Sequence, residues 1–140
     1  MTEVARASRV VAIHERTVEG IRNELAKMNL VVAELEAAWH EAENAYKKAC
    51  EEPLQIAHID DLESSSGHLR HLRQNADIVL LRLTHARAAA EEKRSELIAA
   101  QTELKKLQMW RDQWASKAET EEARKERKLT DDLASRRAMK

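Results

Sequence analysis

The stretch that decides the fold runs from residue 4 to residue 50 and reads VARASRVVAIHERTVEGIRNELAKMNLVVAELEAAWHEAENAYKKAC. Apolar residues recur in it every seven positions in two series, Val4, Val11, Val18, Leu25, Val32, Trp39, Tyr46 and Ala7, His14, Ile21, Met28, Leu35, Ala42, Ala49. His14 is the one clearly polar member of the fourteen. A seven-residue repeat held over seven heptads predicts a coiled-coil helix. We place this first helix at about residues 3–51, with Thr2 as its N-cap.

The repeat stops at Pro53 and resumes after the linker ESSSG, which ends at Gly67. Because proline lacks an amide hydrogen and its ring clashes with the preceding turn, we expect an elbow over 52–67. Within it, residues 53–62 can form a short helix of their own. The second set of core positions is Leu69, Ala76, Leu83, Ala90, Leu97, Leu104, Arg111 and Leu72, Val79, Ala86, Lys93, Ala100, Leu107, Trp114. It predicts a second helix over about 68–137.

If the chain folds back at this elbow, facing core residues have numbers that sum to about 118. This register sets Val4 opposite Trp114 and leaves Trp110 one position off the seam, partly exposed. It also sets Lys93 opposite Leu25, with the lysine stem in the core and its head in water. We therefore expect one all-α domain over 1–140, a long two-helix antiparallel coiled-coil hairpin with a longer C-terminal helix. The hairpin is expected to be monomeric, with an overhang from about residue 118 that has no partner in the chain.

Composition excludes several classes of protein. Charged residues make up 35% of the chain, with only two Gly, one Pro and no Phe, which is typical of long helices and unlike a sheet protein. Net charge is −1 and no segment is basic enough for nucleic-acid binding to be the main role. Uninterrupted apolar runs are too short to cross a bilayer, so we expect no direct membrane insertion and a cytoplasmic location.

Motifs for catalysis are missing from the sequence, which has no phosphate-binding glycine loop, no Gly-x-Ser-x-Gly and no His-Glu-x-x-His. We predict no enzyme and no cofactor. His58, His68 and His71 allow a metal site to be considered, but exposed histidines at an elbow are the preferred interpretation. Cys50 has no base fixed near it and is interpreted as a packed or partly exposed thiol.

The segment QMWRDQW, residues 108–114, places two tryptophans four positions apart just before the charged overhang. Aromatic residues at helical spacing belong to a core more often than to a contact surface, and we assign Trp114 mainly to the core. Trp110 is assigned to a partner-binding surface. The overhang is either a solvated face or a surface that a partner reads through its blocks of charge. Its candidate partner-binding cations are Arg124, Lys125, Arg127, Lys128, Arg136 and Arg137.

The segment ELKKLQMWRDQWASKAETEEARKERKLTDDLASRR, residues 103–137, and the unequal helices around it resemble the central stalk proteins of type III secretion, the flagellar FliJ and injectisome YscO/HrpO group. The resemblance implies a non-catalytic stalk whose paired termini enter a hexameric secretion ATPase. It also implies promotion of ATPase activity, contact with the export gate, binding of export chaperones by some members, and a place beside the inner-membrane secretion apparatus. The residues that match the ring-facing segment are those of about 110–137.

Two other functions stay open on the sequence. The same heptads can build a structural or adaptor rod that homodimerises, either through two single chains or through two hairpins in a four-helix bundle. A helical export chaperone is the third interpretation. The sequence also leaves open whether the export machine is flagellar or an injectisome.

Overall fold

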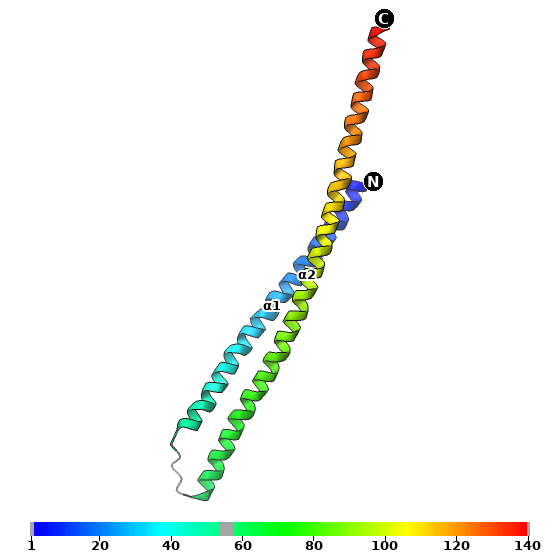
Figure 1. Ribbon diagram of the computed structural model, residues 1–140. Helices are drawn as coiled ribbons and strands as arrows, with labels where there is room; N and C mark the ends of the chain where they lie inside the picture. Colours follow the sequence, from blue (N-terminus) through cyan, green and yellow to red (C-terminus); the bar gives the residue numbers. More distant parts are fainter. Residues whose placement is uncertain (1, 54–57, 140) are drawn as a thin grey trace. The chain divides into compact units, whose positions relative to one another are not determined.

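Two long helices make up the described part of the protein. The structure is a computed structural model that describes residues 2–53 and 58–139. Helix α1 runs over Glu3–Glu51 and helix α2 over Ile59–Ala138 (Figure 1). The Thr2 hydroxyl oxygen accepts a hydrogen bond from the Ala5 amide at 3.2 Å, which satisfies one of the free N–H groups at the start of α1. The predictions of an all-α hairpin with a longer second helix, and of Thr2 as N-cap, are confirmed.

The heptad positions form the seam between the helices. All fourteen predicted core positions of the first helix and all fourteen of the second are buried or half-buried. The most deeply buried are Ala7, Val11, Val18, Leu25, Ala42, Ala76, Leu83 and Ala90. Since a coiled coil buries one narrow stripe of each helix, this burial confirms the heptad assignment.

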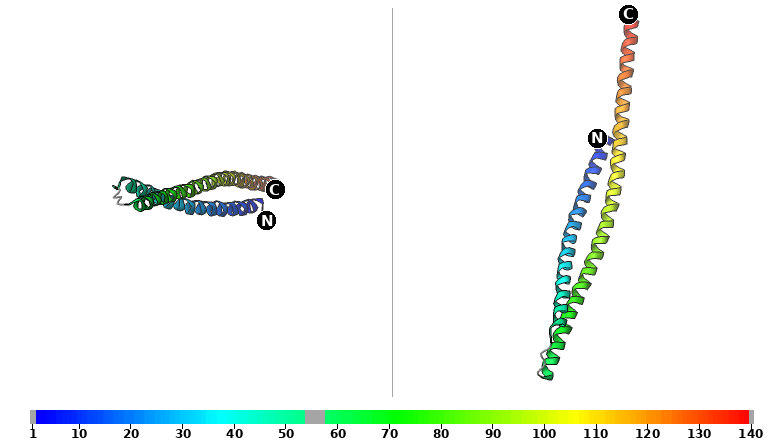
Figure 2. Two further views of the ribbon diagram at one scale, coloured as in Figure 1. Left: turned by 90° about the horizontal axis from the view of Figure 1, so that it is seen from below. Right: turned by 60° about the vertical axis from the view of Figure 1, so that its left-hand side comes forward.

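Contacts divide the chain into two compact units, an elbow unit and a terminal unit. The elbow unit comprises Ile21–Glu96, and its helical segments lie side by side in Figures 1 and 2. Ion pairs link Glu36 to Arg87 at 2.8 Å and Glu43 to Arg73 at 3.6 Å. The α1 residue with the higher number pairs with the α2 residue with the lower number, so the two segments are antiparallel. The sums of these numbers, 36 + 87 = 123 and 43 + 73 = 116, lie near the predicted 118.

Lys93 occupies a core position of the elbow unit, and its positive charge is compensated by ion pairs with two carboxylates. Its side chain is 17% exposed, and its ammonium group contacts the carboxylates of Glu24 and Glu96. The hydrogen bond and charge of Lys93 hold the pKa of Glu24 below its ordinary value. In turn, the hydrogen bonds with Glu24 and then Glu96 raise the pKa of Lys93. The apolar stem is therefore packed while the head reaches the surface, as the sequence predicts.

The terminal unit comprises residues 1–20 and 97–140. Its seam buries Ala7, Val11 and Val18 of α1. On α2 the burial of the seam ends with Trp114 and Ala115, which are half-buried, and every described residue from 116 to 139 is exposed. The structure therefore leaves the last turns of α2 uncovered in this unit.

The start of the second helix corrects the sequence prediction. We expected α2 at about residue 68, after an elbow over 52–67, but it begins at Ile59 and includes the serines and Gly67. Gly67 costs about 1 kcal/mol relative to alanine, but extending an existing helix is easy because each added residue gains a hydrogen bond. Asp60 and Asp61 in the first turn also favour a helix start. Of the short helix predicted at 53–62, residues 54–57 lie outside the described residues, and residues 59–62 belong to α2.

Candidate functional site

The candidate site lies in the terminal unit, where the first turn of α1 meets the two tryptophans of α2. One open groove of about 260 Å³ is lined by Thr2, Glu3 and Val4 on α1, and on α2 by Trp114, Lys117, Ala118 and Glu121. A second groove, of about 200 Å³, is lined by Glu3, Arg6, Trp110 and Trp114. The tryptophan rings thus form apolar walls between charged side chains, which is a suitable arrangement for an amphipathic partner surface.

The two tryptophans differ in burial as the heptad positions predict. Trp114 is half-buried and shares a groove with Val4, the residue predicted to face it. Trp110 lies beside the seam and is 40% exposed. The Lys117 ammonium lies 5.3 Å from the centre of the Trp114 ring, a cation–π contact that covers part of the ring. Trp110 is therefore the more accessible of the two rings.

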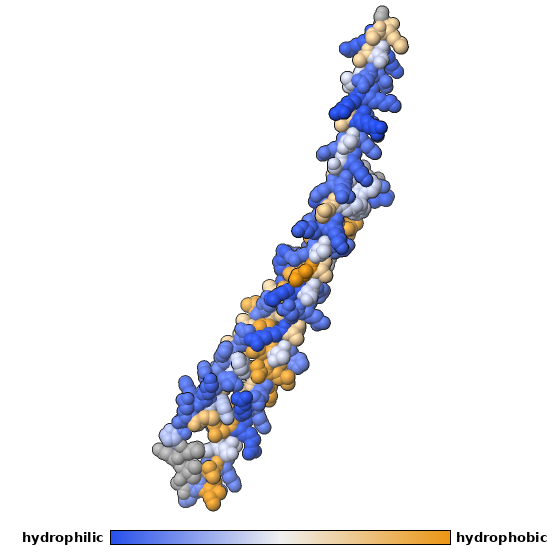
Figure 3. Space-filling model, in the orientation of Figure 1, coloured by the Kyte–Doolittle hydropathy of each residue, from blue (hydrophilic) through white to orange (hydrophobic). Residues whose placement is uncertain are grey.

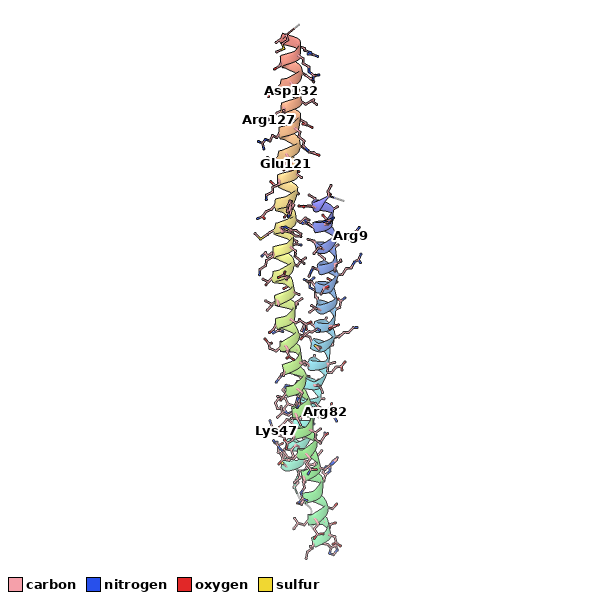
Figure 4. The ribbon with its side chains drawn as sticks, turned by 90° about the vertical axis from the view of Figure 1, so that its right-hand side faces the viewer. Arg9, Lys47, Arg82, Glu121, Arg127 and Asp132 are labelled. Atoms are coloured by element: carbon pink, nitrogen blue, oxygen red, sulfur yellow. The ribbon has the colours of Figure 1, made fainter. Side chains whose placement is uncertain are left out.

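The exposed end of α2 (residues 116–138) continues from this site as a single helix. Side chains such as Glu121, Arg127 and Asp132 project from it with no second helix beside them (Figure 4). Its surface is mostly hydrophilic, whereas apolar patches gather over the elbow unit (Figure 3). Residues 118–140 hold seven cations and six acids, a net charge of 7 − 6 = +1. The segment is thus strongly charged but close to neutral.

The six cations predicted to bind a partner all lie on this exposed segment: Arg124, Lys125, Arg127, Lys128, Arg136 and Arg137. Successive residues of a helix are turned by about 100°, so the spacing of these six distributes them around the axis. The segment consequently presents positive charge in several directions. Trp110 is separated from them by more than three turns of α2.

Sequence reasoning placed Val4 at the site but missed three of its charged residues. Glu3, Arg6 and Lys117 line the grooves but were not singled out. The signal available in the sequence was the register, because numbers that sum to about 118 place the first turn of α1, residues 3–6, beside residues 112–115. Lys117 also follows Trp114 by three positions, a spacing that brings side chains together on a helix.

Two kinds of feature are absent from the described residues, a cluster of metal ligands and a membrane-spanning helix. Across 2–53 and 58–139, no three His, Cys, Asp or Glu side chains converge to hold a metal ion. His58, His68 and His71 are exposed, as is the Cys50 thiol. Over the part of the chain that is described, neither helix is apolar enough for long enough to cross a membrane.

A two-helix hairpin with an uncovered, charged end on its longer helix defines the class as a coiled-coil protein. The sequence matches the family described as flagellar FliJ protein over residues 6–140, and the chain belongs to this family. It is therefore a stalk-like structural component of flagellar or type III protein export. No curated protein and no solved structure matched the chain.

Proposed function

We propose that the protein is the central stalk of a type III secretion system and inserts its paired termini into the hexameric secretion ATPase. In this role it promotes ATPase activity and couples the ATPase to the export gate in the inner membrane. The chain itself is not catalytic. It works on the cytoplasmic side, peripheral to the membrane, and also receives export chaperones.

The observation that carries this proposal is the exposed end of α2, which belongs to a chain of the FliJ family. An uncovered helix about 24 residues long measures roughly 36 Å, comparable to the diameter of a small domain. Such a segment reaches into a central opening without the bulk of a second helix. The grooves at Trp110 and Trp114 lie where the segment begins and supply a contact for the rim of the ring.

The distribution of charge suits a ring of six subunits. One helix cannot match sixfold symmetry, so its contacts with the subunits must be weak and interchangeable. Exposed ion pairs are worth only about 0 to 1 kcal/mol each, and complementary charge raises the rate of association more than the affinity. Cations in several directions around the axis, including Arg127 and Arg136, meet this need.

The test is stimulation of the cognate secretion ATPase by the full chain. Reversing two adjacent cations, Arg127→Glu with Lys128→Glu, should raise the concentration for half-maximal stimulation by about three- to tenfold. Trp110→Ala should weaken stimulation by a similar factor, because Trp110 presents an exposed ring beside the groove. Each variant should keep the helical circular dichroism of the parent, because these side chains lie off the seam.

The matched control reverses two cations of the elbow unit, Lys47→Glu with Arg70→Glu, which changes the net charge equally. We expect this control to stimulate the ATPase as the parent does. Equal loss in both double variants would mean that net charge alone matters. Full stimulation by a chain ending at residue 117 would refute the ring-facing assignment of the exposed segment.

A further inference from the structure

The two flanks of the seam differ in the elbow unit. On one flank, ion pairs between the helices, Glu36 with Arg87 and Glu43 with Arg73, close the edge. The other flank carries a groove of about 250 Å³ whose lining is almost entirely apolar, made by Lys27, Met28, Val31, Ala86 and Ala89. Val31 is 47% exposed beside this groove. The Glu24–Lys93 ion pair joins the helices at the Lys27 end of this flank, and the apolar patch beyond it, around Val31 and Ala89, is left open.

Four charged side chains frame the patch. Seven residues of a helix turn through about 700°, so Lys27 and Glu34 lie on one stripe of α1 with Val31 between them. By the same rule Arg82 lies on the stripe of Ala89 on α2, and Glu92 follows one turn later. All four are exposed. Among the described residues, the cross-helix ion pairs involve other side chains, and the charge of Lys27 also acts on Glu24 of the same helix, where it helps to lower the pKa of that carboxyl group.

The signs of these four charges form a self-complementary pattern. In the antiparallel register Lys27 lies at the same level along the helix axes as Glu92, since their numbers sum to 119, and Glu34 lies at the level of Arg82, since their numbers sum to 116. Each end of the patch therefore has one charge of each sign. At one end the positive charge is on α1 and the negative charge on α2, and at the other end the signs are reversed. A two-fold axis lying in such a face brings every charge opposite one of the other sign, whether the copies run parallel or antiparallel.

We infer that this face, defined as the pairing face by Lys27, Val31, Glu34, Arg82, Ala89 and Glu92, binds a second copy of this chain. The apolar centre then packs against itself and is removed from water, while four ion pairs form at its rim. The result is a local four-helix arrangement of the two elbow units. A second copy is favoured over an unrelated helix because the four charges at the rim complement the same face.

The pairing face shares no residue with the exposed end of α2 or with the tryptophan grooves. Self-pairing and ATPase docking are therefore measured separately, and the failure of one leaves the other standing. A paired form also holds two exposed segments, so dilution or engagement by a partner changes the number of free segments per particle.

The experiment uses two variants of the full chain with opposite charge on the face. The acidic variant carries Lys27→Glu and Arg82→Glu, and the basic variant carries Glu34→Lys and Glu92→Lys. Sedimentation equilibrium up to about 0.1 mM should show dimers for the parent and a dissociation constant at least about tenfold weaker for each variant alone. An equimolar mixture of the two variants should recover dimers, because opposite charges meet again.

The control Lys47→Glu with Arg70→Glu changes the charge by the same amount on the opposite flank and should dimerise like the parent. Lys47 and Arg82, one from each double variant, are labelled in Figure 4. Circular dichroism reports folding of every variant. A parent that stays monomeric over the whole concentration range overturns the inference, and so does a mixture that stays monomeric. Loss of dimers in the control would also overturn it, by showing that the assembly does not use this face.

Discussion

Truncation of Leu83 to alanine tests whether the seam of the elbow unit supplies the stability of the hairpin. Leu83 is a heptad residue of α2 with 0% exposure, and with Val11 it is the largest fully buried side chain. Leucine and alanine are both strong helix formers, so the substitution hardly changes helix propensity. The effect on the free energy of unfolding therefore reports packing between the helices.

The expected loss follows from the buried methylene groups. Leu→Ala removes about three carbon atoms, worth roughly 0.8 kcal/mol each, and a residual cavity adds to this. A two-helix seam collapses around a gap more readily than a globular core, which limits the cavity contribution. We expect Leu83→Ala to lower the free energy of unfolding by about 2–4 kcal/mol.

Leu81 provides a matched control on the same helix, two positions away and 59% exposed. Only 100 − 59 = 41% of its surface is covered, so Leu81→Ala should cost about 1 kcal/mol or less. The assay is urea unfolding followed by circular dichroism at low protein concentration, where self-association is negligible. Equal losses for the two variants would refute the assignment of Leu83 to a seam between helices.

Two further predictions concern the helix backbone and the one charged core residue. Gly20 and Gly67 are helical, and a Cβ atom at either would meet nothing within 4 Å. Alanine at each position should therefore raise the free energy of unfolding by up to about 1 kcal/mol, measured as a higher melting temperature. A lower melting temperature would contradict the open surroundings. The pKa of Glu24 is lowered by Lys93 from 4.5, so its stabilisation is complete above that value and lost as pH falls through the folded-state pKa. The urea concentration at the unfolding midpoint should therefore fall as the pH is lowered, and Glu24→Gln should reduce this fall. An unchanged fall in the variant would mean that other carboxylates cause it.

Much of the fold was predictable because a coiled coil is specified locally. The heptad period states which side of each helix is buried, and residues such as Leu83 and Lys93 lie where the repeat places them. The interruption at Pro53 likewise predicts the end of α1, which falls at Glu51. The start of α2 at Ile59 was not predictable from turn-forming residues, because an adjacent long helix outweighs the local preference of Gly67.

By itself, the sequence determined the two helices and their core stripes, since these depend on period and length, but it allowed the stripes to pair within one chain or between two. Only the tertiary structure decided how the two flanks of the seam differ. The pairing of Glu36 with Arg87 on one side, and the open groove at Val31 and Ala89 on the other, depend on which residues meet across the helices. These contacts between the helices depend on the axial register. A seven-residue repeat allows several registers, because sliding one helix by seven residues leaves the same apolar stripe at the seam.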